Sequence, residues 1–325
     1  MGLLCQAPAF REAAGNKDRT AMKPCIFIHT NEKQIIGALV SKYSFERFAT
    51  DASAFEVRLV ETATYQWMKD YEGQLYLRDG LKRHWLNDDL QSFTVLRFTP
   101  PEIMGYRGRS LVVDPDVFCI SDVSALLNRD MQGAAIQARH RAGSKQDVWA
   151  SSVMLLDNAK LTQWKVERNF EEMFRFERDY MKWITLQLEP QGSIGQLETC
   201  WNDFDRLTPE TRMIHNTKRQ TQPWKSGLPV DFRPPESKGS FTPKNVYHRV
   251  RRALFGDYGL LGTYDRHPDP NQERLFFALL KECYEKGIVT EAMIRSEMKH
   301  NHVRHDALDL IKLTPTLHER PLFAA

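Results

Sequence analysis

One short stretch decides the fold that we expect of this chain: Leu-Val-Val-Asp-Pro-Asp-Val-Phe-Cys-Ile, residues 111–120. Its first three residues are apolar, as in a strand that is buried on both faces of a parallel sheet. Asp114 and Asp116 follow directly. Ligands of such sheets bind outside the carboxyl ends of the strands, and two hard oxygen donors so close together suit Mg²⁺ or Mn²⁺. Aspartate and proline also favour turns, so the stretch alone allows a plain turn.

The bulk composition is that of an ordinary globular protein. The chain has 325 residues, of which 42% are hydrophobic and 27% charged, enough for one large α/β domain and a smaller unit. A net charge of +3 argues against a dedicated nucleic-acid binder, which concentrates basic residues on one surface. The five cysteines are scattered without a C-x-x-C pair, which argues against a structural zinc site and favours a reducing, cytoplasmic location.

Strand-like and helix-like segments alternate along most of the chain. The patterns predict strands at residues 25–29, 56–60, 111–113, 133–138, 149–157 and 213–215, and helices at 34–48 and 169–183. This order predicts an α/β fold, with a mostly parallel central sheet flanked by helices, over residues 22–230. We expect residues 1–21 to be a disordered leader or extension, residues 231–243 a linker rich in proline and glycine, and residues 244–325 a helical C-terminal extension.

Five features follow one another in order along residues 25–225. They are Thr30-Asn31 with Gly37-Ala38-Leu39, the Asp-x-Asp at 114–116, Ser151 to Leu156, Gly195-Gln196-Leu197 with Trp201-Asn202, and Ile214-His215 with Pro223-Trp224. In this order they resemble a glycosyltransferase of the Rossmann-like GT-A fold, similar to glycosyltransferase family 8 and within it to a bacterial branch. The resemblance implies transfer of a sugar from a nucleotide-diphosphate donor, by default a UDP-sugar, with retention of configuration. The acceptor is an unknown glycan, lipid or protein.

The resemblance also implies which residues form the site. The metal ligands, for Mn²⁺ or Mg²⁺, would be Asp114, Asp116 and His215. The donor contacts would be Thr30, Asn31, Gly37, Arg97, Ser152 and Lys218. From their chemistry, Thr30 and Asn31 can bond a base or ribose, and Gly37 lets a helix approach closely. An ordinary helix cap and a packed helix explain the same residues. Among the arginines we favour Arg97, a polar residue between two apolar ones, which could fork onto phosphate oxygens.

The chain departs from the family in two places. Lys218 and Gln222 stand where the family has a glycine and a lysine, in a loop that is one residue longer. The segment 183–189 lacks the family's Asp-Gln pair, so that Glu189 is its only carboxylate and the only candidate for a catalytic group there. A second hypothesis therefore stays open, a non-catalytic nucleotide-sugar-binding or scaffold protein on a degenerate GT-A fold. A nucleotidyltransferase ranks last, because no glycine-rich phosphate loop follows the first strand.

The extension carries a basic run, His-Arg-Val-Arg-Arg-Ala-Leu-Phe, residues 248–255. Most basic helix faces are simply solvated. A basic amphipathic segment can also touch anionic lipid, which would place the protein at the inner face of a membrane. An oligomer or partner surface is the remaining alternative for this extension.

Overall fold

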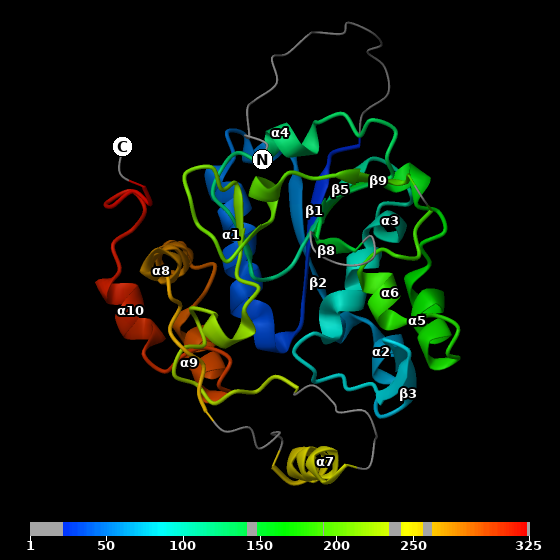
Figure 1. The fold of residues 1–325 in the computed structure, drawn as a ribbon. Helices are drawn as coiled ribbons and strands as arrows, with labels where there is room; N and C mark the ends of the chain where they lie inside the picture. The colour runs from blue at the N-terminus through cyan, green and yellow to red at the C-terminus, as the bar shows by residue number, and fades with distance from the viewer. Residues whose placement is uncertain (1–21, 142–147, 191, 234–241, 256–261, 324–325) are drawn as a thin grey trace, which may run out of the picture.

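The computed structural model describes residues 22–141, 148–190, 192–233, 242–255 and 262–323. Its centre is a six-stranded sheet with helices on both sides (Figure 1). The strand order is β2 (Glu56–Glu61), β1 (Cys25–Thr30), β5 (Arg109–Val113), β8 (Trp149–Asp157), β7 (Ile136–His140) and β9 (Ile194–Gln196). Only β8 runs against its neighbours, while the other adjacent pairs are parallel. The predicted fold class, a mostly parallel sheet flanked by helices, is therefore confirmed.

Two smaller sheets and a set of helices complete the described chain. The smaller sheets are β10 (Asp203–Phe204), β11 (Met213–His215) and β6 (Val117–Cys119), and the hairpin of β3 (Leu75–Arg78) and β4 (Leu81–His84). The helices up to residue 190 are α1 (Ile35–Phe48), α2 (Gln66–Lys69), α3 (Pro100–Ile103), α4 (Ser124–Leu127), α5 (Val166–Phe174) and α6 (Tyr180–Ile184), with a 3₁₀ helix at Ser92–Phe98. The later helices are α7 (Pro243–Phe255), α8 (Pro270–Glu285), α9 (Glu291–Lys299) and α10 (Ala307–Leu313).

Both faces of the central sheet are covered. All six residues of β1 are buried. Cys25 and Phe27 belong to the hydrophobic cluster on one face, whereas Ile26 and Ile28 belong to the cluster on the other. Successive side chains of a strand point to opposite faces, so each face of β1 must be apolar. This requirement explains the unbroken apolar runs that predicted the strands.

The single helix predicted for residues 169–183 is wrong. α5 ends at Phe174, and Phe176 has a φ of 62°, which a helix cannot continue through. α6 then starts afresh, because the side chain of Asp179 accepts hydrogen bonds from the backbone N–H groups of Met181 (2.8 Å) and Lys182 (3.2 Å). The sequence pattern misses the break because apolar residues recur on both sides of it.

The C-terminal helices pack onto the main fold. α8 and α10 share one hydrophobic cluster with the outer side of α1, which contributes Ile36 and Val40. Glu282 of α8 also accepts hydrogen bonds from the Tyr43 hydroxyl and the Arg47 Nε, both at 2.7 Å. α1 therefore lies between the central sheet and the C-terminal helices. The predicted leader (1–21) and most of the predicted linker (234–241) lie outside the described residues.

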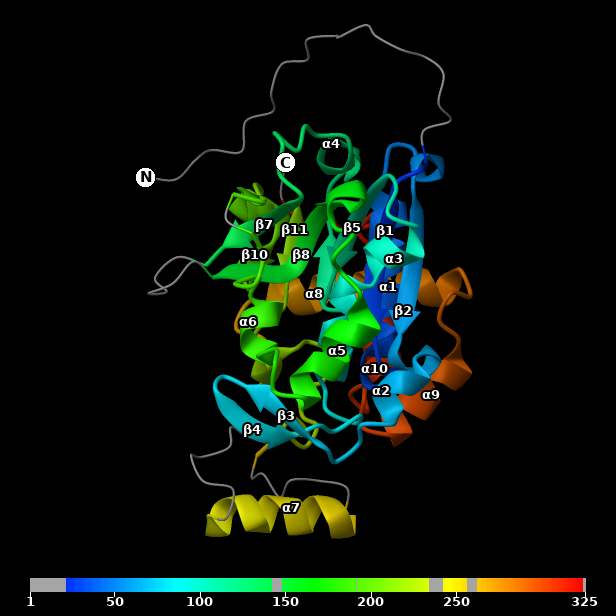
Figure 2. The same cartoon turned by 90° about the vertical axis from the view of Figure 1, so that its right-hand side faces the viewer.

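α7 lies at one end of the molecule. In two views at right angles it lies beyond the β3–β4 hairpin, at the end of the molecule away from α4 (Figures 1 and 2). Within the described part of the chain, no helix combines the length and the apolar character that crossing a bilayer would require.

Candidate functional site

Asp114 and Asp116 lie in a tight turn between β5 and β6. The N–H of Asp114 donates to the Ser152 carbonyl on β8 (3.0 Å), and the N–H of Val117 donates back to the Asp114 carbonyl (3.2 Å). Proline suits the second position of such a turn. β6 then pairs with β11 in a register that sets His215 opposite Val117. The turn and this register bring His215 beside both aspartates.

Gly37 of α1 lies against this turn. A Cβ atom at Gly37 would lie 2.9 Å from the carbonyl oxygen of Pro115, closer than carbon and oxygen atoms pack. Glycine costs a helix about 1 kcal/mol relative to alanine, and the close approach of helix and turn gives a physical reason for accepting that cost. Gly37 therefore allows α1 to pack directly against the backbone of the turn that carries the two aspartates.

Asp114 is buried and held by two side chains. The guanidinium of Arg97, from the 3₁₀ helix, donates through Nε to Oδ1 (2.9 Å) and through a terminal nitrogen to Oδ2. His29 Nε2 lies 2.6 Å from Oδ1, and burial lowers the pKa of His29, so the ring is neutral and donates. Burial alone would raise the pKa of Asp114, but Arg97 and the bond from His29 outweigh it and hold this pKa well below its ordinary value. Asp114 is thus a fixed carboxylate.

His215 is oriented by an amide. Its Nδ1 lies 2.9 Å from Oδ1 of Asn202, whose Nδ2 donates to the Ser152 hydroxyl (3.1 Å). With the amide in this orientation Nδ1 carries the proton, so the lone pair of neutral His215 is on Nε2. That Nε2 lies 3.2 Å from Asp116 Oδ1 and 3.9 Å from Asp114 Oδ2. One ligand atom from each of the three residues lies within 4.8 Å of the others.

The three residues fit a divalent cation. Oδ2 of Asp116 accepts from the Gln222 amide (3.1 Å), whereas its buried Oδ1 makes no hydrogen bond. A neutral His215 would direct a lone pair at this oxygen, and only a cation or a proton relieves that contact. Burial disfavours the proton, but the charges of Asp116 and Asp114 outweigh burial and raise the pKa of His215. Two carboxylates and one imidazole are an acceptable ligand set for Mn²⁺ or Mg²⁺.

The three residues line a cavity of about 350 Å³. Its walls carry a mixture of arginines, small polar side chains and aromatic rings. Among the lining residues that the structure describes, Asp114 and Asp116 are the only carboxylates. Besides these two and His215, the lining includes Arg97, Trp149, Ser152, Phe204, Arg219 and Gln222.

The structure divides the predicted donor residues into two groups. Arg97 and Ser152 line the cavity. Thr30, Asn31, Gly37 and Lys218 are not among its lining residues. The buried amide of Asn31 donates to the carbonyls of Asp89 and Leu90 (both 3.3 Å), and therefore secures the loop after the β3–β4 hairpin. Lys218 is exposed, and its backbone N–H donates to Asp205 (3.2 Å).

Glu189 also lies outside the cavity lining. Its carboxylate accepts from the indole of Trp164 (2.9 Å) and the amide of Gln163 (3.4 Å). Burial raises the pKa of Glu189. In this position the side chain fastens the end of the α6 segment, and the geometry gives it no contact with a ligand in the cavity.

Sequence reasoning missed several residues of the site. His29 and Asn202 hold the proposed ligands, and Gln222 holds Asp116. Asn202 belongs to one of the motifs of the resemblance, but its hydrogen bond to His215 leaves no local pattern in the sequence. For His29, its place near the carboxyl end of an apolar strand was the one available signal.

Comparison with known proteins finds similarity in three dimensions only. No protein-family model matches the sequence, and no curated protein matches it at a significant level. The structure is similar to that of galactosyltransferase LgtC in complex with donor and acceptor sugar analogues, at 12% identity over 62% of this chain and 89% of that chain, with a TM-score of 0.45. It is also similar to glycosyltransferase GlyE of Streptococcus pneumoniae, at 14% identity over 82% of this chain and 64% of that chain, with a TM-score of 0.45. For mouse xyloside xylosyltransferase 1 the identity is 12% over 59% of this chain and 97% of that chain, with a TM-score of 0.40. The case for a function therefore rests on the side chains of the site.

Proposed function

We propose that this protein is a metal-dependent glycosyltransferase that uses a nucleotide-diphosphate sugar, by default a UDP-sugar. One observation carries the proposal, the convergence of Asp114, Asp116 and His215 at the edge of a cavity, with ligand atoms within 4.8 Å of one another. The acceptor is a glycan, a lipid or a protein. Retention of the anomeric configuration is part of the proposal through the family resemblance of residues 25–225.

The chemistry explains why such a cluster is needed. Cleavage of a sugar–phosphate bond leaves negative charge on the diphosphate, and a bound Mn²⁺ or Mg²⁺ would supply the compensating positive charge. Other side chains of the protein hold the three proposed metal ligands in position. Arg97 fixes Asp114, Gln222 fixes Asp116, and Asn202 fixes the tautomer of His215. Partners of this kind orient metal ligands and hold them ready before the ligand arrives.

The cavity wall suggests how a donor is held. Arg219 lines the cavity where Lys218 does not, and we assign the predicted diphosphate contact to Arg219 instead. The rings of Trp149 and Phe204 offer apolar surface on which a sugar or a base can stack. Ser152 lines the same cavity and already accepts from Asn202 (3.1 Å), which leaves its hydroxyl proton for a ligand.

The second candidate function is binding of a nucleotide sugar without transfer. It is favoured by the composition of the cavity, in which no described lining carboxylate is available beyond Asp114 and Asp116. No acidic group of the described lining is then left to act on an acceptor. The two functions differ in turnover, and share the metal and the donor.

Asp116→Asn is the sharpest test. It keeps the size of the side chain and the bond from Gln222, and it removes one negative ligand. We expect metal-dependent release of UDP from a panel of UDP-sugars to fall by about a thousandfold, because charge stabilisation of the leaving group is lost. The control is Asp309→Asn on α10, an exposed aspartate remote from the cavity lining, which should leave release unchanged.

Release that persists in Asp116→Asn would contradict the assignment of the metal site. If the wild-type protein binds Mn²⁺ and UDP in calorimetry and hydrolyses no donor on the panel, the non-catalytic function is the better conclusion. The anomeric configuration of any transferred sugar, measured by NMR, tests retention separately.

A further inference from the structure

α7 is an amphipathic helix without an acidic residue. Its sequence, Pro-Lys-Asn-Val-Tyr-His-Arg-Val-Arg-Arg-Ala-Leu-Phe, contains four lysines and arginines and one histidine. Val246, Val250 and Leu254 recur every four residues, so their side chains lie on one face of the helix. Asn245 and Arg252, seven residues apart, lie on the opposite face.

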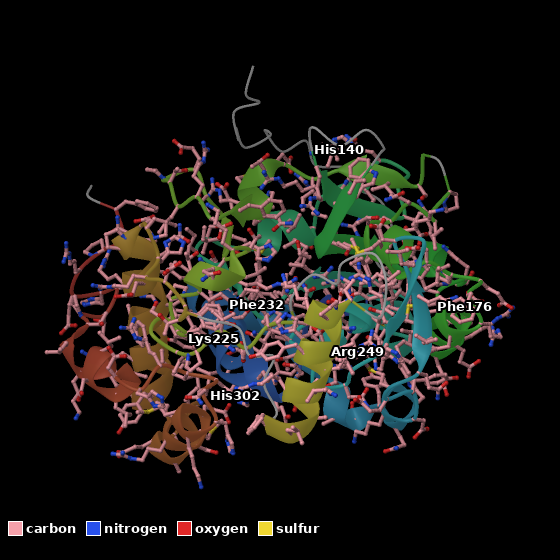
Figure 3. All side chains as sticks on the ribbon, turned by 60° about the horizontal axis from the view of Figure 1, so that its bottom comes forward. His140, Phe176, Lys225, Phe232, Arg249 and His302 are labelled. Carbon is pink, nitrogen blue, oxygen red and sulfur yellow. The ribbon has the colours of Figure 1, made fainter. Side chains whose placement is uncertain are left out.

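The polar face attaches α7 to the protein. Asn245 is buried, and one terminal nitrogen of Arg252 donates to Glu72 (3.1 Å) and to Asp88 (2.5 Å). Glu72 lies just before the β3–β4 hairpin and Asp88 just after it. Figure 3 brings this end of the molecule toward the viewer, with Arg249 labelled on α7. The helix is therefore held against the protein by its charged side.

The apolar face points away from the protein. Val246 is 42% exposed, Val250 50% and Leu254 70%. None of the three belongs to a hydrophobic cluster of the described residues. Surface helices normally do the reverse and bury their apolar stripe. The neighbouring hairpin carries two further exposed leucines, Leu75 and Leu81.

We propose that α7 is a membrane-docking helix that lies in the interface of a bilayer rich in anionic lipid. The positive charge of α7 favours an anionic bilayer over a second copy of the chain as the partner of its apolar face. A helix with basic residues, no acidic residue and an outward apolar stripe matches an interface that is apolar below and negative above. A second copy of the chain would set one cationic α7 against another, at a cost in repulsion. The proposal does not depend on glycosyl transfer, because it rests on α7 alone.

The test is sedimentation of the full-length protein with vesicles. One set contains phosphatidylcholine with phosphatidylglycerol, and the other contains phosphatidylcholine alone. We expect binding to the anionic vesicles that weakens as salt is added, because exposed charges are screened. Leu254→Ser should weaken this binding about tenfold by removing apolar surface from the interface. Lys244→Glu should weaken it by a similar or larger factor, since each charge near the surface counts.

Matched controls lie on α10. Leu313 is 78% exposed, so Leu313→Ser removes as much apolar surface as Leu254→Ser does. Lys312 is an exposed lysine like Lys244, so Lys312→Glu makes the same change of charge. Neither control should alter vesicle binding, and circular dichroism establishes that all four variants are folded.

Three results would overturn the proposal. They are wild-type protein that stays in solution with anionic vesicles, equal losses in the α7 and α10 variants, and a dimer in light scattering that Leu254→Ser converts to a monomer. The last result would assign the stripe to a second copy of the chain. Vesicle binding with no UDP release would support the membrane helix while contradicting the proposed activity.

Discussion

Arg97→Met is predicted to destabilise the protein more than any other single substitution at the site. Arg97 is buried, and its guanidinium donates to both oxygens of Asp114 and to the Ser151 hydroxyl (2.8 Å). Methionine has a similar length and no donor. Asp114 would stay buried with the neutral His29 as its remaining hydrogen-bond partner at 2.6 Å, and with Nε2 of His215 at 3.9 Å. The substitution therefore leaves a negative charge inside the fold without its counter-charge.

The expected cost is about 3–5 kcal/mol, the usual range when one partner of a buried ion pair is removed. Urea unfolding followed by tryptophan fluorescence measures it. Arg295→Met is the control, because Arg295 forms an exposed pair with Glu291 one turn earlier in α9, and such pairs contribute no more than about 0.5 kcal/mol.

A double variant identifies the cause. In Arg97→Met with Asp114→Asn both charges are gone, so the combined loss should be smaller than the sum of the two single losses by about 2 kcal/mol or more. If the free energy of unfolding of Arg97→Met is within about 1 kcal/mol of the wild-type value, the argument is refuted, since an uncompensated buried carboxylate costs more than that. Additive losses would refute it in another way, by showing that Arg97 acts through something other than Asp114.

Three further predictions concern the metal site. Asn202→Leu should lower Mn²⁺ affinity in calorimetry about 10–100-fold, because Nδ1 of His215 loses the partner that fixes its tautomer. The rise in melting temperature caused by Mn²⁺ should be larger at about pH 8 than at about pH 6, because Asp116 raises the pKa of His215 and the cation must displace that proton. A histidine with a raised pKa stabilises the metal-free protein while it is protonated, at low pH. This stabilisation is lost as the pH rises through that pKa. Gly37→Ala should lower the free energy of unfolding by about 1–3 kcal/mol, because its methyl group would meet the Pro115 carbonyl at 2.9 Å.

Each of these has a result that would contradict it. Mn²⁺ affinity unchanged in Asn202→Leu would mean that His215 is not a ligand or needs no support. A melting-temperature rise that is the same at both pH values would mean that no group titrating between them competes with the cation. A more stable Gly37→Ala protein would show that helix propensity outweighs the contact with Pro115.

The sequence predicted the framework of the site better than its contents. Runs such as residues 25–28 and 153–156 are apolar because both faces of their sheet are covered, and this pattern can be recognised without a structure. Asp114, Asp116 and His215 were also chosen from the sequence, and the structure places them together. The two aspartates stand out as carboxylates at a strand end, whereas His215 was chosen through the family resemblance.

Partners across the fold were beyond the reach of sequence reasoning. Arg97 was chosen for phosphate contact, yet in the structure it neutralises Asp114. Thr30 and Asn31 occupy the expected strand end, but Asn31 donates to the loop after the hairpin and neither residue lines the cavity. Which side of a strand end faces the cavity depends on packing by elements far along the chain, and no local pattern records it.

The packing of the C-terminal helices on α1 has a consequence for folding during synthesis. Tyr43 bonds to Glu282, 239 residues further along, and the apolar side of α1 is covered by α8 and α10. At the usual pace of translation this cover reaches α1 on the order of tens of seconds later. Until then a newly made α1 exposes Ile36 and Val40, a surface suited to a chaperone or to aggregation. The helix that lies against the Asp114–Asp116 turn is thus among the first to be made and among the last to be fully packed.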